Sequence, residues 1–155
     1  MGVNLERTNE TLNDVVAALR DSQEGLRDAA GHTACPDLKL MFMDFSTQRA
    51  QFRGELQNEV ERLGNPAPRE AGTVLGALHR RWMELKAAVV SNEDQALIEE
   101  CERGEDALIE TYSKALCNEM PRYIQEILER QLMLIGAQRT ILDLLELTLA
   151  TSSAA

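Results

Sequence analysis

The stretch FSTQRAQFRGEL, residues 45–56, contains the pattern that decides the fold. Phe45, Phe52 and Leu56 recur at the spacing of one helix face, so a helix here would bury all three side chains in a common core. The same face carries Arg49 in its middle. Because an unpaired guanidinium costs several kcal/mol to bury, Arg49 needs a carboxylate and hydrogen-bond acceptors inside the protein. The stretch therefore predicts a helical core that is polar at its centre.

The rest of the sequence divides into helices at sparse punctuation. Pro36 and Pro121 stand at the entries of long periodic segments, where a missing N–H is tolerated. Gly64 follows the last apolar position of its segment, and Ser91-x-x-Asp94 is typical of a capping box. These signals predict four long helices over residues 9–31, 36–63, 92–117 and 121–149 and a shorter connecting helix over residues 73–90.

The lengths of the connections predict the topology. The first two long helices, and likewise the last two, are joined by only a few residues, so each pair should form an antiparallel hairpin. The connecting helix of about 18 residues would span roughly 27 Å, enough to retrace the bundle. We therefore predict one all-α domain over residues 1–155, with a core over about 9–149 and a frayed end over 150–155. It should be an antiparallel four-helix bundle with a long helical crossover between the second and third core helices, the connection of ferritin-type bundles.

Alternate steps of four and three along each helix give the side chains that face a bundle core. Five polar residues fall on these faces: Gln23, Arg49 and Glu105 near the midpoints of their helices, and Gln131 and Gln138 on either side of theirs. We expect them at one level of the bundle, with Glu105 as the partner of Arg49 and glutamine amides completing the hydrogen bonds. The remaining large positions on these faces include Leu12, Leu19, Leu26, Phe42, Leu56, Leu108, Tyr112, Ile124 and Leu128.

An alternative interpretation of this pattern stays open. A single polar residue on a helix seam commonly lies at the boundary of the core, and Arg49 could extend along Phe45 and Phe52 to reach solvent. The core would then be purely apolar, with polar tips leaning outward.

The charge of the chain limits its partners. The formal net charge of −10 would be repelled by phosphate backbones and anionic lipid surfaces, so neither nucleic acid nor a membrane is expected as a partner. No apolar run approaches the ~20 residues of a membrane span, and the first residues lack the apolar core of a signal peptide. Widely spaced cysteines without a C-x-x-C pattern favour reduced thiols. We therefore expect a cytoplasmic protein.

Five segments carry a family resemblance: LNDVVAAL (12–19), EGLRDAA (24–30), RAQFRGEL (49–56), LHRRWMELK (78–86) and ERGEDALIETY (102–112). Their order and spacing resemble an uncharacterised bacterial family, a domain of unknown function within the ferritin-like superfamily. The resemblance implies a closed four-helix bundle with a helical crossover, in agreement with the helix pattern, and brings no established activity.

Catalytic members of that superfamily bind two metal ions through one Glu from each of two helices and an E-x-x-H from each of the other two. In this sequence Glu105 matches such a position, whereas the first helix offers Gln23. On the second helix the nearest equivalents are Gln48 and Gln51, which flank Arg49. On the fourth they are Ile135 and Gln138, and neither helix has a histidine. Because a cation beside Arg49 would be repelled and an amide oxygen is a weak ligand, we predict no metal, no cofactor and no catalytic residues.

Two functions follow as hypotheses. The first is a non-catalytic ferritin-like bundle that acts as a stress-related or scaffold protein, through a homo-oligomer or a protein partner. The second is a ferritin-like oxidase or iron-handling protein that holds iron or manganese on a non-standard carboxylate site of Glu24, Glu102 and Glu105. Because the sequence contains no glycine-rich phosphate loop, no G-x-S-x-G and no H-E-x-x-H, it favours the non-enzymatic function.

Overall fold

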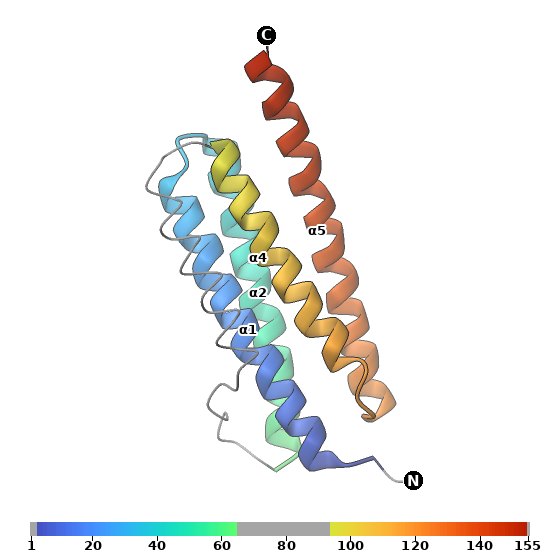
Figure 1. Ribbon diagram of the computed structural model, residues 1–155. Coiled ribbons are helices and arrows are strands. Elements are labelled where there is room, and N and C mark those ends of the chain that lie inside the picture. Colours follow the sequence, from blue (N-terminus) through green and yellow to red (C-terminus); the bar gives the residue numbers. More distant parts are fainter. Residues whose placement is uncertain (1–2, 65–93, 155) are drawn as a thin grey trace.

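The structure, a computed structural model, describes residues 3–64 and 94–154. Long helices make up almost all of these two ranges. No strand occurs in these two ranges, which confirms the prediction of an all-α protein. The helices are α1 (Leu5–His32), α2 (Pro36–Arg62), α4 (Asp94–Ala115) and α5 (Arg122–Ala154) (Figure 1).

The helix ends differ from the sequence prediction mainly at two places. The first helix begins at Leu5 because the side chain of Asn4 accepts a hydrogen bond from the backbone N–H of Arg7 at 3.1 Å. The last helix continues to Ala154 instead of fraying over 150–155 as predicted. Its final residues contain neither Gly nor Pro to stop it. Gly64 ends α2 as predicted, with a φ of 84° that suits glycine.

Two hydrogen bonds fix how the helices run relative to one another. Thr33, just after α1, donates to the Asp94 carboxylate at 2.7 Å, and Asn118, just after α4, donates to Thr11 at 3.4 Å. Since α4 begins where α1 ends, α4 runs antiparallel to α1 and begins at the end of the bundle where α2 begins. This is the direction predicted for the third core helix. The predicted connecting helix over 73–90, the loop before it and the Ser91 cap lie outside the described residues.

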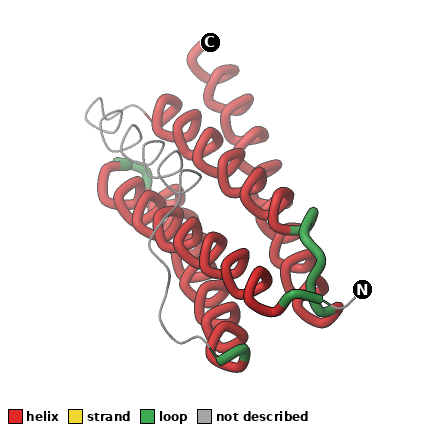
Figure 2. Tube along the Cα trace, turned by 60° about the horizontal axis from the view of Figure 1, so that its bottom comes forward, coloured by secondary structure: helices red, strands yellow, loops and turns green. Residues whose placement is uncertain are grey.

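Most of the core consists of the predicted helix faces. Val15 and Ile98 are fully buried although they lie off those faces, whereas the predicted Leu145 and Leu149 are only partly buried. The α1–α2 hairpin lies beside the α4–α5 hairpin, and these four helices run as long rods (Figure 2). Among the described helices, none is long and apolar enough to cross a membrane. The large apolar and aromatic side chains that are fully buried come from all four described helices: Leu12, Leu19, Leu26, Phe42, Leu56, Ile98, Leu108, Tyr112, Ile124, Leu128, Ile135 and Leu142.

Neighbouring helices of the bundle do not all pack equally closely on one another. The backbone of α1 packs closely on α2 and α4, and α5 packs on α4, but α5 approaches α2 at only a few positions. Long polar side chains therefore bridge the α2–α5 side of the bundle. This gap is where the predicted polar residues meet.

Candidate functional site

Arg49 forms the centre of a polar layer that includes a side chain from every described helix. Its side chain is 0% exposed, although Arg is among the costliest residues to bury. One end of the guanidinium forms an ion pair with Glu105 of α4, and Nε donates to the hydroxyl of Ser22 on α1 at 3.1 Å. Nη1 donates to Gln138 of α5 at 2.6 Å and to the neighbouring Gln48 at 3.1 Å. The Arg49 layer, defined by these five residues, thus joins all four helices.

A second set of polar contacts lies farther along α5. The hydroxyl of Tyr112 donates to the side-chain oxygen of Gln131 at 2.7 Å, and burial raises the pKa of Tyr112, so the hydroxyl keeps its proton. The amide nitrogen of Gln131 donates to Glu55 at 2.9 Å. Arg130 pairs with the same carboxylate at 2.5 Å. These contacts bridge α5 to both α4 and α2 but do not touch Arg49.

The structure brings together three of the five predicted residues, Arg49, Glu105 and Gln138. Gln131 is buried, but it belongs to the Tyr112 contacts and not to the Arg49 layer. The placement of Gln23 in the layer is wrong. Its side chain is only half-buried, its Oε1 has no hydrogen-bond partner among the described residues, and Ser22 takes the predicted place.

The missed partner Ser22 follows from helix geometry. The fully buried line of α1 takes the step of three before the step of four, so that it passes through Leu19, Ser22 and Leu26 instead of Leu19, Gln23 and Leu26. The backbone carbonyl of Gln23 accepts a hydrogen bond from Ser46 at 2.9 Å. A long side chain such as Arg49 also needs a small residue opposite it. A short hydroxyl residue next to the predicted position was the signal that could have identified Ser22.

The Arg49 layer contains an ion pair that is shielded from solvent. Its one cation and one carboxylate are both 0% exposed, and the remaining members are a hydroxyl and two amides. Only one Glu105 oxygen is used, because its Oε1 has no hydrogen-bond partner in the described part of the chain. The nearby thiol of Cys101 is also fully buried, and burial together with the adjacent Glu105 raises its pKa, so it does not provide a thiolate nucleophile.

A known family model matches the helices that carry most of this layer. The family model described as "Domain of unknown function (DUF2383)" matches residues 7–118, more than half of the chain. The chain belongs to the DUF2383 family. This confirms the resemblance to a family of unknown function, while the placement of DUF2383 within the ferritin-like superfamily stays a prediction. The matched residues include Ser22, Gln48, Arg49 and Glu105, and Gln138 lies beyond them. No curated protein and no solved structure matches the chain.

The carboxylates of the alternative metal site in this DUF2383 chain do not meet. Glu24 is exposed on α1, and Glu105 is paired with Arg49 in the core. Glu102 is buried but pairs through Oε2 with Arg139 of α5 at 3.0 Å. Within residues 3–64 and 94–154, the acidic side chains that come within ligand distance of one another are instead Glu102, Asp143 and Glu146.

The Glu102 carboxylate lies in an unusual electrostatic environment. Burial and a hydrogen bond to Glu146 raise its pKa to about 8, although Arg139 opposes the shift. Asp143 lies in the same group, and its hydrogen bond to Arg139 lowers its pKa. One group of side chains therefore contains carboxylates whose pKa values are shifted in opposite directions.

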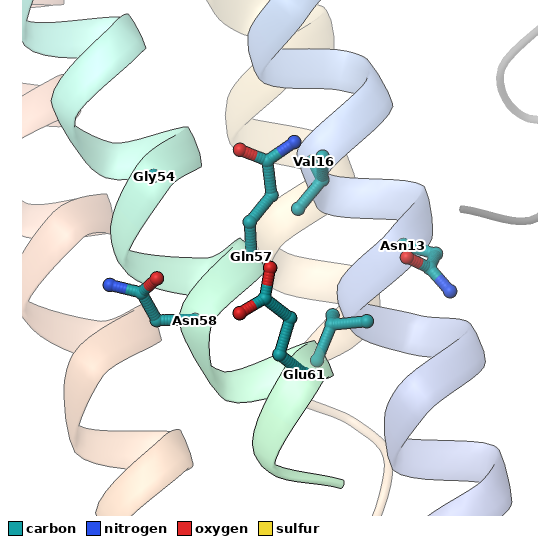
Figure 3. A pocket seen from close by; sticks show the side chains of 7 residues that line it. Asn13, Val16, Gly54, Gln57, Asn58 and Glu61 are labelled. Atoms are coloured by element: carbon teal, nitrogen blue, oxygen red, sulfur yellow. The ribbon is translucent and has the colours of Figure 1, made fainter. Parts of the chain in front are cut away.

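A pocket of about 260 Å³ opens on the α1–α2 side of the DUF2383 bundle. In Figure 3, Gln57 and Glu61 of α2 lie beside Val16 of α1. Its seven lining residues are Asn13, Val16, Gly54, Gln57, Asn58, Val60 and Glu61. Because Glu61 is the one titratable group among them, the lining provides no pair of groups for acid–base or nucleophilic catalysis.

Proposed function

We propose that this DUF2383 protein is a non-catalytic, ferritin-like helical bundle that acts as a scaffold by self-association. The observation that carries the proposal is the Arg49 layer. Arg49 and Glu105 lie at the centre of the bundle, where catalytic ferritin-like proteins hold two metal ions between four helices. Two divalent cations next to a guanidinium with one carboxylate would leave a large uncompensated positive charge.

An exposed stripe on α5 supports self-association. Met133, Ile141 and Leu144 are exposed by 68%, 42% and 60% and recur along one side of the helix. The opposite side of α5 carries the core residues Ile135 and Leu142, so the helix is apolar on two faces. A helix that is apolar on more than its core face is typical of one that is buried on both sides.

The occupant that fits this stripe best is a second copy of the chain. The whole chain carries a net charge of −10, so two copies repel except where a surface lacks charge. Over residues 131–149 the charged side chains are Arg139, Asp143 and Glu146, and they gather toward Glu102 of α4, away from the stripe. In Figure 1, α5 also extends beyond the neighbouring end of α4. A two-fold axis would pair two such stripes antiparallel.

Leu144→Glu tests the self-association. Each copy would lose one buried leucine, worth about 1.5–3 kcal/mol, so a two-fold dimer should dissociate at least about 100-fold more easily. Sedimentation velocity over a concentration series would give the dissociation constants of wild type and variant. Leu40→Glu is the matched control, because Leu40 is exposed by 65% on α2, outside the stripe, and should leave the dimer intact. A wild-type protein that sediments as a monomer throughout contradicts the proposal.

Ferrous iron tests the non-catalytic part of the proposal. Wild-type protein mixed with Fe²⁺ in air should consume oxygen no faster than Fe²⁺ in buffer alone, because Arg49 fills the position of a di-iron centre. An oxygen electrode gives the rate. Oxygen consumption that the protein accelerates, and that Glu105→Ala abolishes, would instead favour the oxidase hypothesis.

A further inference from the structure

The α4–α5 side of the bundle contains an excess of carboxylates around one arginine. Arg139 Nη1 lies 3.0 Å from Glu102 and 2.6 Å from Asp143, and its Nε lies 2.7 Å from Asp106. Glu146 belongs to the same group but has no ion pair with Arg139 among the contacts of the described residues. Three carboxylates therefore pair with one guanidinium and a fourth, Glu146, lies beside two of them, which leaves the group short of positive charge.

The second observation concerns one oxygen atom. Glu102 is 7% exposed, and while its Oε2 is paired with Arg139, its buried Oε1 receives no hydrogen bond from an N–H or O–H group of the described residues. The neighbouring Glu146 carboxylate hydrogen-bonds to Glu102 only when the two share a proton, and supplies no donor of its own. A buried carboxylate oxygen without a donor is costly and needs an explanation. Because Glu102 lies within ligand distance of Asp143 and Glu146, a cation between the three carboxylates would supply the missing partner.

We propose that Glu102, Asp143 and Glu146 bind one hard divalent cation, Ca²⁺ or Mn²⁺, between α4 and α5. The donors are all carboxylate oxygens, the ligands that these ions prefer over nitrogen or sulfur. The three ligand atoms lie within 4.8 Å of one another. Since Ca²⁺–oxygen distances are about 2.3–2.6 Å, one ion can contact oxygens up to about 5 Å apart without a movement of the backbone.

The three ligands come from two helices, Glu102 from α4 and Asp143 and Glu146 from α5. Asp143 and Glu146 are three residues apart on α5, so they share one face of the helix. Arg139, one turn before Asp143 on α5, forms ion pairs with both Asp143 and Glu102 and thus positions the two carboxylates. The ion would tie the second half of α5 to α4. It would be structural rather than catalytic and distinct from the Arg49 layer.

Manganese provides the direct test. Chelator-treated full-length protein is titrated with Mn²⁺ alone, and the EPR signal of free Mn²⁺ gives the bound fraction. We expect one site per chain with a dissociation constant below about 10⁻³ M, the weak end of known calcium sites. Addition of Ca²⁺ should release the Mn²⁺. Retention of the Mn²⁺ would instead assign the site to manganese alone.

Matched variants separate this site from other acidic surfaces. Glu146→Gln and Asp143→Asn each remove one charged ligand and should weaken Mn²⁺ binding at least about tenfold, whereas Glu110→Gln, an exposed acid on α4, should not change it. Mn²⁺ should also raise the melting temperature of wild type but not of Glu146→Gln. Binding that is absent, or that is unchanged in both ligand variants, overturns the proposal. Binding lost in Glu105→Gln alone would place the ion in the core and contradict the proposed function instead.

Discussion

Glu105→Ala is expected to lower the free energy of unfolding by about 3–5 kcal/mol, because it leaves a buried guanidinium without its counter-charge. Arg49 and Glu105 are both 0% exposed, so neither water nor dissolved ions can replace the missing carboxylate. A domain of this kind has a total stability of about 5–15 kcal/mol, so the loss should bring the variant close to unfolding. Urea denaturation followed by circular dichroism measures the difference. The control is Glu110→Ala, whose side chain is 66% exposed, with an expected change within about 0.5 kcal/mol.

Replacing Arg49, Glu105 and Gln138 together should cost far less than removing Glu105 alone. In the triple variant Arg49→Met, Glu105→Leu, Gln138→Leu, the charges and the amide that faced them disappear together, and the stability should return to within about 2 kcal/mol of wild type. A single variant that loses less than about 1 kcal/mol would mean that Arg49 reaches solvent. A triple variant less stable than Glu105→Ala would mean that the layer contributes stability, and not chiefly the alignment of the helices.

The contacts of Arg49 explain why alignment is the expected role. The guanidinium binds Ser22, Glu105 and Gln138, which come from three different helices, while Arg49 itself lies on the fourth. A shift of any helix by one turn is about 5.4 Å and would separate at least one donor from its acceptor. An apolar core of leucines penalises such a shift less, because one leucine can replace another. The layer therefore selects one register of the bundle.

Periodicity predicted the fold because burial follows helix geometry. The line Phe42, Arg49, Leu56 repeats every seven residues, and all three side chains are fully buried. Helix ends depend instead on single local contacts. The free energy of the cap at Asn4, or of the last turn before Ala154, is a small fraction of that of burying the core. The pattern of apolar residues therefore does not predict either helix end.

The candidate site was predictable in part. The pairing of Arg49 with Glu105 follows from charge alone, because no other Asp, Glu, Lys or Arg lies on the predicted core faces. The prediction of a single polar level was wrong for Gln131, which is seven residues from Gln138 and thus roughly 10 Å away along α5. Two such residues cannot both reach the level of Arg49.

The group of Glu102, Asp143 and Glu146 could not be predicted from the sequence. Its formation depends on how far α5 is displaced along α4, and a displacement of one turn would pair Glu102 with other side chains. The sequence provides the i, i+3 spacing of the two α5 ligands but not their level on the neighbouring helix. The level of Glu102 on α4 relative to these two α5 residues is therefore visible only in the structure.

Phe42→Ala is expected to lower the free energy of unfolding by about 3–5 kcal/mol, the usual cost of the cavity left by a buried phenylalanine. Phe42 is 0% exposed and lies two turns before Arg49 on the same face of α2. It therefore reports whether that face is turned inward. Leu40→Ala is the matched control on the same helix, because Leu40 is exposed by 65% and its truncation should change the stability by less than about 0.5 kcal/mol. Urea denaturation of both variants gives the comparison.

Which of these two substitutions lowers the stability more shows whether Arg49 faces the core or the solvent. If Leu40→Ala were the more destabilising one, α2 would be rotated, and Arg49 would lie in solvent instead of in the core. If Phe42→Ala is the more destabilising, as expected, its effect should add to that of Glu105→Ala, because the two sites are roughly 10 Å apart along the bundle. The combined loss of about 6–10 kcal/mol is comparable to the whole stability of such a domain. If the measured stability of the wild type is no larger than this loss, the double variant should be largely unfolded in the absence of urea. A combined loss well below about 6 kcal/mol would show that one of the two side chains is not buried.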